Sequence, residues 1–328
     1  MPDISDLKLR IEVEYGIRVK DIFEFKDELL FSSSNNIYFL RKDKMKETDF
    51  ISVGGLYEYL KANGFKNMLK AYCTIKGKYY IKSSNEYYMI FDHIDSEDFS
   101  IFNDGKLMAR FLAKFHKCAR GFMPPAGGRI KSYWGRWTEE YCKKYKDIKN
   151  FEEKMASIDK KTAADEAFLK SLGKYMERMQ KSISMLKSDG YLDIVEESMK
   201  AHEVCIKSFK QSYFYKNESN INIKYLNKCG YDIYEKDISD FMCKIVESGM
   251  DDIKDLKELI YVYKCENFSR NYNKDIIRAF LLFPEQYVKV CCKYMKNNDK
   301  FAQEKYIEKL KCAEHIEDKK MELVDALN

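Results

Sequence analysis

The sequence predicts an α+β protein with a small, β-rich N-terminal lobe and a larger, mainly helical C-terminal lobe. Short β-branched and aromatic runs, separated by polar turn clusters, fill the N-terminal part of the chain. From Asn103 onward the apolar residues recur at helical spacing instead. The 328 residues include 14 Gly and 4 Pro, well below the usual shares of about 7% and about 5%, which favours long helices over tight turns. We therefore expect a β-rich lobe over residues 1–95 and a helical lobe over residues 96–328.

The N-terminal lobe is expected to contain a hairpin, one helix and three further strands. The runs DIFEFKDELLFSS and IYFLRK flank a polar tip at residues 34–36, which is the pattern of a β-hairpin. The helix that follows should end at Asn63-Gly64, because glycine tolerates the left-handed conformation found at helix ends. The strand candidates cover residues 68–77, 78–84 and 86–94, with turns at Lys76-Gly77 and Ser84-Asn85.

The C-terminal lobe is expected to be helical with one embedded hairpin. Its first helix carries an apolar stripe that ends near His116. Further helices are expected at about 136–156, 162–188, 191–202, 235–248, 252–265, 272–296 and 299–326. Between them, residues 204–226 have β-branched and aromatic runs on both sides of the polar residues 216–220, which indicates a β-hairpin. With a strand-like linker near residues 91–95, this order predicts a bilobal, protein-kinase-like architecture with an antiparallel sheet in the N-terminal lobe.

The composition excludes several classes of protein. Lys and Arg total 58 and Asp and Glu total 53, which gives a net charge of +5. This small excess argues against a strongly basic nucleic-acid-binding protein. The 10 cysteines form no C-x-x-C pair, which argues against a zinc module and against a disulfide-built domain. The N-terminal segment is acidic where a signal peptide is apolar, and no run approaches about 18 apolar residues. We expect a soluble protein, made in a reducing compartment, that contacts no membrane.

Several short strings occur in a fixed order along the chain. They are LKANGF at residues 60–65, TIKGKYYI at 74–81, LAKFH at 112–116, GRW at 135–137 and FPEQYVK at 283–289. Together, over residues 10–325, they resemble the CotS/CotI type of spore coat protein, a relative of the aminoglycoside phosphotransferases and choline kinases. The resemblance implies the bilobal fold of those kinases.

The resemblance also identifies the positions at which a phosphotransferase needs particular chemistry. Phosphoryl transfer requires a Lys on the phosphates, an Asp near the attacking hydroxyl, and an Asn and an Asp on the metal. The lysine position aligns with Arg41. The catalytic string C-H-x-D-L-x-x-x-N aligns with residues 205–213, so that Ser208 replaces the Asp and Tyr213 replaces the Asn. The metal string I-D-F-D-x-C, with Cys229 as its Cys, places Tyr225 where the metal Asp belongs.

These replacements predict a degenerate active site, with no catalytic residue, bound metal or cofactor. A phenol with a pKa near ~10 is neutral at pH 7 and cannot replace a carboxylate for a hard divalent cation. The resemblance then implies a structural component of the bacterial endospore coat, a pseudokinase made in the mother-cell cytoplasm and incorporated into the coat. Its partners would be other spore coat proteins, and neither nucleotide nor nucleic-acid binding is expected.

Candidate partner surfaces are the aromatic residues Trp134 and Trp137 and the Lys-rich residues 300–320, although the latter also fit an ordinary solvated helix face. Cys291 and Cys292 are expected to be buried thiols, with the bridging of chains in an oxidising coat as the alternative. His116 is expected to be structural. The acidic residues Asp92, Asp95, Glu97 and Asp98 fit a solvated hinge better than a cation site.

Two other functions stay open. The first is an active small-molecule phosphotransferase that uses other carboxylates, such as Asp232 with Asp237 or Asp240. The second is ligand binding without chemistry in a cleft that is still open.

Overall fold

The computed structural model of this chain forms two compact units, each built from separate stretches of sequence. It describes residues 4–25, 28–34, 36–94, 99–217, 219–267, 271–296 and 303–327. The first unit combines Met1–Ser100, Arg110–Ser132 and His202–Tyr231, and the second combines Ile101–Ala109, Tyr133–Ala201 and Asp232–Asn328. Residues that are late in the sequence therefore pack with the N-terminal strands. The boundary that we expect between residues 95 and 96 lies outside the described residues.

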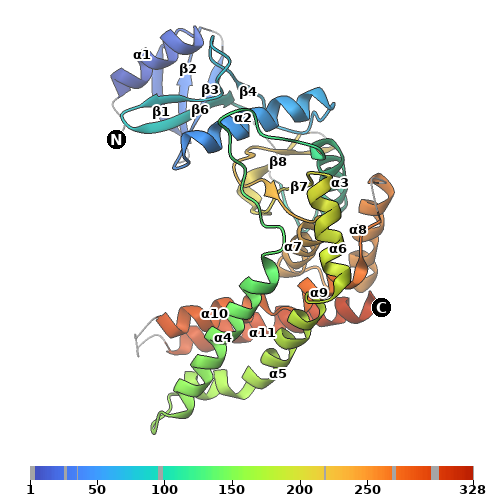
Figure 1. Cartoon of the computed structure of the whole chain (residues 1–328). Coiled ribbons are helices and arrows are strands. Elements are labelled where there is room, and N and C mark those ends of the chain that lie inside the picture. The colour runs from blue at the N-terminus through green and yellow to red at the C-terminus, as the bar shows by residue number, and fades with distance from the viewer. Residues whose placement is uncertain are drawn as a thin grey trace. The chain divides into compact units, whose positions relative to one another are not determined.

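A six-stranded antiparallel sheet forms the centre of the first unit, in the order β1-β2-β3-β6-β4 with β5 paired to β6 (Figure 1). Its strands are β1 (Asp21–Phe25), β2 (Glu28–Ser32), β3 (Ile37–Asp43), β4 (Ala71–Tyr72), β5 (Ile81–Ser83) and β6 (Glu86–Asp92). Helix α1 (Ile4–Tyr15) packs its buried residues Leu7 and Ile11 into a core cluster with Tyr38, Leu40 and Ile90.

The opposite face of the sheet is packed against α2 (Glu47–Ala62) (Figure 1). Because side chains alternate along a strand, Phe39, Arg41 and Asp43 lie on this face while Tyr38 and Leu40 face α1. The ring of Tyr57, on α2, lies 6.0 Å from the ring of Phe91 on β6. The alternation of side chains along β3 therefore places Arg41 on the face of the sheet opposite α1.

The sheet differs from the sequence prediction in its strand pairing. The run at residues 21–33 was expected to be one strand of a hairpin, but it forms both β1 and β2, so β1, β2 and β3 make a meander. β4 and β5 were expected to pair through the turn at Lys76-Gly77, but they do not pair with each other: β4 pairs with β6, and β5 makes only the expected pair with β6. Helix α1 was not expected, although Leu7, Ile11 and Tyr15 recur at helical spacing.

The predicted β5–β6 turn is confirmed. Ser84 and Asn85 have φ angles of 47° and 65°, and two successive left-handed residues are typical of the two-residue hairpin turn that matches the twist of the strands.

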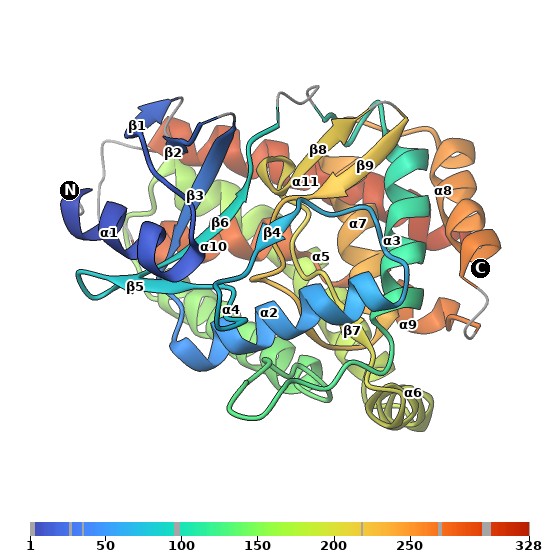
Figure 2. The same cartoon turned by 90° about the horizontal axis from the view of Figure 1, so that it is seen from above.

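The rest of the first unit contains two small two-stranded sheets. The predicted hairpin forms as β8 (Phe214–Asn217) and β9 (Asn220–Ile223), whereas the residues before it contain only β7 (Val204–Cys205) and the 3₁₀ turn η1 (Gln211–Tyr213). β7 pairs with β10 (Gly230–Tyr231). Figure 2 shows the hairpin beside the segment that leads into β4, where Leu69 N donates to Ile223 O over 2.8 Å and Ile223 N donates to Asn67 O over 3.0 Å.

The second unit is helical in its described residues. Its helices are α4 (Trp137–Ala156), α5 (Ala163–Met185), α6 (Asp189–Lys200), α7 (Tyr234–Glu247), α8 (Ile253–Glu266), α9 (Lys274–Leu282), α10 (Glu285–Lys296) and α11 (Gln303–Ala326). α3 (Gly105–Ala119) is divided between the two units. The single helix expected over 272–296 is wrong, because Pro284 has no N–H to continue the helix and separates α9 from α10. None of the helices in the described ranges is both long and apolar enough to span a bilayer.

Candidate functional site

The structure brings three of the four aligned kinase positions together in the first unit. The guanidinium carbon of Arg41, on β3, lies 3.4 Å from the ring centroid of Tyr225 and 5.8 Å from that of Tyr213. Tyr225 follows β9, and the backbone N of Lys224 donates to Tyr213 O over 2.8 Å. The hairpin β8–β9 thus holds both phenol rings next to the arginine.

Ser208, the fourth aligned position, lies in the loop between β7 and η1. Its side chain is half-buried, and the preceding residue, Lys207, has a left-handed φ of 63°. Within the described part of the chain, no hydrogen bond or ion pair joins Ser208 to Arg41, Tyr213 or Tyr225.

Aromatic packing fixes the ring of Tyr225. The rings of Phe39 and Phe91 each lie 5.9 Å from it, and Tyr225 is 7% exposed. Burial raises the pKa of the Tyr225 phenol to about 12, and the positive charge of Arg41 only partly opposes this shift. The side chain at the aligned metal position is therefore neutral at pH 7, and a neutral phenol does not fit the carboxylate site that Mg²⁺ needs.

Two polar residues that the sequence analysis did not single out complete this cluster. Arg41 Nη2 lies 3.4 Å from Asp43 Oδ2, and Asn227 Nδ2 donates a hydrogen bond to the same oxygen. Asp43 could have been found as the residue two positions after Arg41, on the same face of β3. Asn227 occupies the second Asp position of the metal string. The contact between Asp43 and Asn227 spans 184 residues, so no local pattern predicts it.

Two buried atoms of this cluster lack a hydrogen-bond partner among the described residues. They are the Nε of Arg41 and the Oδ1 of Asn227. Each such atom costs about 1–3 kcal/mol of desolvation. The cluster is thus less completely satisfied than an ordinary core.

Helix α2 supplies no ion-pair partner for Arg41 within the described residues. Its Tyr57 donates from Oη to Lys224 O over 3.2 Å. The carboxylates of Glu47 and Glu58 accept hydrogen bonds from Tyr80 and Tyr79. The acid that pairs with Arg41 is therefore Asp43 on its own strand.

The two cavities that Arg41 or Tyr225 themselves line are small. A cavity lined by Phe39, Asp92, His93, Tyr215 and Tyr225 has a volume of about 30 Å³. Since one water needs about 10–15 Å³, this cavity holds two or three water molecules and no purine base. The cavity that Arg41 and Tyr57 line is smaller still, at about 10 Å³.

The carboxylates of the alternative assignment belong to the second unit, where Asp232 and Asp240 have partners and Asp237 is buried. Asp232 and Asp237 are fully buried, and Trp137 Nε1 donates to the two oxygens of Asp232 over 3.1 and 3.0 Å. Asp240 pairs with the buried Lys236. None of the three lines the cavities beside Arg41.

The residues that the sequence offers as a partner surface are partly buried and partly exposed. Trp134 and Trp137 pack against the core of the second unit, and Trp134 Nε1 donates to Ser198 Oγ over 2.9 Å. In the Lys-rich C-terminal segment, Lys305, Lys309 and Lys311 are exposed, whereas Lys320 is 1% exposed and pairs with Glu317 at 2.9 Å. Cys291 is fully buried, as the expectation of buried thiols requires, so the Cys291-Cys292 pair has one member that cannot bridge chains.

Three solved structures with the same fold bear the names of kinases that act on small molecules. An aminoglycoside phosphotransferase from Alicyclobacillus acidocaldarius matches with a TM-score of 0.80 and 12% identity, covering 96% of this chain and 93% of that chain. A spectinomycin phosphotransferase bound to AMP matches with a TM-score of 0.63 and 14% identity, over 95% and 97% of the two chains. A choline kinase from Cryptosporidium parvum matches with a TM-score of 0.54 and 13% identity, over 98% and 97%. The predicted bilobal fold, with an N-terminal antiparallel sheet and a helical C-terminal lobe, is confirmed.

The family comparison covers almost the whole sequence. The family described as "Spore coat putative kinase YutH" matches residues 8–327. This match confirms the spore-coat and kinase-like parts of the resemblance, with YutH rather than CotS/CotI as the matching family. The chain therefore belongs to the spore coat putative kinase YutH family.

Proposed function

We propose that this chain is a non-catalytic, kinase-fold component of the spore coat, which acts by binding other coat proteins after its synthesis in the mother cell. The observation that carries the proposal is the stacking of the Arg41 guanidinium on the ring of Tyr225 at 3.4 Å. The phosphate-binding and metal-binding positions of a kinase are here in contact with each other.

Electrostatics supports this proposal. Phosphoryl transfer depends on positioned cations that neutralise the charge developing on the phosphates. Here the charge of Arg41 is directed to Asp43 and to two phenol rings. Asp43 in turn accepts a hydrogen bond from Asn227, so the nearest carboxylate is also engaged within the chain.

The rival function is ATP-dependent phosphotransfer. It is favoured by the names of the relatives, which are kinases, and by the presence of Asp43 beside the aligned lysine position. Rotation of the Tyr225 ring away from Arg41 would be required before the guanidinium could reach a nucleotide.

A titration with Mg-ATP separates the two functions. A ligand present at 100 times its Kd adds about 2.7 kcal/mol of stability, which a melting curve detects easily. We expect no Mg-dependent rise in the Tm of this chain with ATP, and no Mg-dependent heat in calorimetry. The spectinomycin phosphotransferase, measured in the same buffers, serves as the positive control.

A clear rise in Tm that requires both Mg²⁺ and ATP would contradict the proposal.

The coat assignment has a separate test, in which spores are extracted after the wild-type gene is replaced by an Asp43→Asn variant. A non-catalytic coat protein should appear in the coat fraction in equal amount for both chains. Loss of the variant from the coat, with unchanged melting of the purified protein, would count against a purely structural role.

A further inference from the structure

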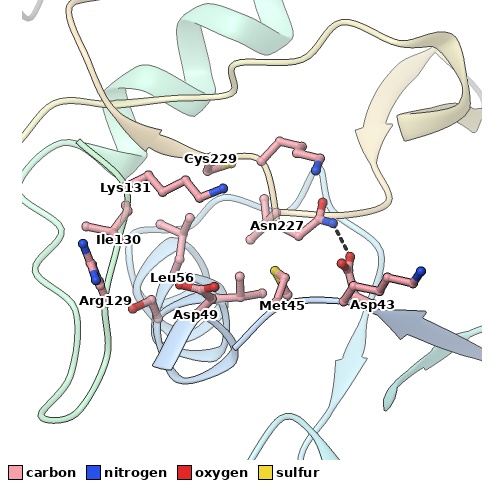
Figure 3. A pocket seen from close by; sticks show the side chains of 14 residues that line it. Asp43, Met45, Asp49, Leu56, Arg129, Ile130, Lys131, Asn227 and Cys229 are labelled. Carbon is pink, nitrogen blue, oxygen red and sulfur yellow. Dashed lines mark hydrogen bonds between the residues drawn. The ribbon is translucent and has the colours of Figure 1, made fainter. Parts of the chain in front are cut away.

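We propose that a cationic cavity in the first unit binds a small organic anion. The cavity has a volume of about 240 Å³ and lies between α2, residues 129–131 and residues 226–229 (Figure 3). Its apolar lining comes from Met45, Val53, Leu56, Ile130 and Leu226. A ligand of this site would therefore meet an apolar surface.

Four cationic side chains line the same cavity and are exposed. They are Lys44, Arg129, Lys131 and Lys228. Across the described ranges, none of these four side chains makes a hydrogen bond or an ion pair. Figure 3 shows the Lys131 side chain extending toward the middle of the cavity, above Leu56. Their charge is available to a ligand.

The two carboxylates in the lining do not neutralise these four cations. Asp43 pairs with Arg41 and accepts from Asn227, on the side of the cavity away from Arg129 (Figure 3). Asp49 accepts a hydrogen bond from Lys46 N over 3.2 Å at the first turn of α2. The cavity is thus positive, and an anionic group is the ligand chemistry that it fits.

The backbone that carries Arg129 and Lys131 is held on both sides. Arg129 N donates to Thr48 O over 2.9 Å, and Tyr231 N donates to Lys131 O over 2.9 Å. The preceding loop approaches α2 so closely that a Cβ on Gly128 would lie 2.8 Å from Ser52 Oγ. Cations on a fixed frame lose less freedom when a ligand binds.

The ligand class follows from the combination of charge and apolar lining. A phosphate monoester or a carboxylate would place its anionic group near Lys131 and Arg129, and its apolar part against Met45, Val53 and Leu56. The cavity shares no lining residue with the space beside Phe39 and Tyr225, but it adjoins the small space beside Arg41, with which it shares Asp43, Met45, Val53, Leu226 and Asn227. The inference needs neither a metal nor a nucleotide, so it stands whether or not the proposed function holds.

Calorimetric titration with phenyl phosphate, benzoate and the uncharged benzyl alcohol tests the site. We expect saturable binding of at least one of the two anions below about 10 mM, and no saturable binding of benzyl alcohol. The Lys131→Ala variant should weaken that binding at least tenfold without a change in melting. Lys76→Ala, which removes an equally exposed lysine of the same unit outside the cavity, is the matched control and should bind as the wild type does.

Comparison of the two anions decides the anionic group, since preference for phenyl phosphate indicates a phosphate ester and preference for benzoate a carboxylate. The inference is overturned if neither anion saturates, if benzyl alcohol binds equally well, or if Lys131→Ala and Lys76→Ala have the same affinity.

ATP also carries phosphates and needs a separate criterion. An effect of ATP that persists in EDTA and disappears in Lys131→Ala reports this cavity, whereas a Mg-dependent effect that survives Lys131→Ala contradicts the proposed function instead.

Discussion

At the scale of single residues, Arg41 and Tyr225 form a stabilising contact with each other at the positions where a kinase binds phosphate and metal. A lysine and an aspartate at these positions would leave charge available to phosphates and metal. An arginine stacked on a phenol forms a cation–π contact, worth about 2 kcal/mol when it is desolvated. The same two positions therefore contribute to stability in this chain.

This change makes stability the property to measure at Tyr225. Tyr225→Ala should lower the free energy of unfolding by about 3–5 kcal/mol, because it removes a buried ring together with the surface on which Arg41 stacks. Tyr225→Phe keeps the ring and should cost about 1 kcal/mol or less. Chemical denaturation of the two variants checks this, and near-equal stabilities of Tyr225→Ala and the wild type would mean that the stack contributes nothing.

Some residues of this cluster could be predicted from the sequence, and others could not. Arg41, Tyr213 and Tyr225 could be aligned from short strings, and the structure places them in contact. Asp43 and Asn227 could not be recognised as a pair, because their meeting depends on how the hairpin β8–β9 docks against the segment before β4. No local sequence pattern predicts a contact between residues that lie this far apart in the chain.

At the scale of elements, local chemistry was predictable and partner choice was not. The turn at Ser84-Asn85 and the end of α2 depend on backbone preferences of a few neighbouring residues, and both were predicted. The choice of β6 as the partner of β4 depends on the packing of the whole sheet, so it was missed, whereas the pairing of β5 with β6 follows from the local turn and was predicted. The break at Pro284 was a local signal that periodicity obscured, since α9 and α10 both have amphipathic patterns.

Helix α2 also illustrates how a position in the fold decides the effect of a glycine. A Cβ on Gly55 would lie 2.5 Å from Pro125 Cδ, whereas a Cβ on Gly173, in α5, meets nothing within 4 Å. Both substitutions to alanine gain helix propensity, up to about 1 kcal/mol. The difference between them therefore isolates the packing of the proline on α2.

We expect Gly173→Ala to stabilise the protein by up to about 1 kcal/mol and Gly55→Ala to destabilise it by about 1–3 kcal/mol. Equilibrium denaturation of both variants is the measurement. If Gly55→Ala were as stable as Gly173→Ala, residues 122–128 would not pack on α2 as described.

At the scale of the whole molecule, the 25 tyrosines make stability depend on alkaline pH. Burial raises the pKa of the phenols of Tyr57 and Tyr141 well above its usual value. It raises the pKa of Tyr215, Tyr225 and Tyr231 to about 12. In the unfolded chain the same phenols titrate near ~10, so the folded state binds protons more tightly than the unfolded state in this range.

The sign of the effect follows from this difference in proton binding. Below pH ~10 both states are protonated and the contribution of these tyrosines to stability is fully present. As the pH rises from about 10 toward 12, the unfolded chain loses its phenolic protons first, and stability falls. We therefore expect the Tm to drop steeply above about pH 10. Absorbance at 295 nm, recorded together with circular dichroism, should show a group of tyrosines that ionises only as the helices unfold. Ionisation of all the tyrosines near pH ~10 with the helices intact would mean that these phenols are not buried as the structure describes.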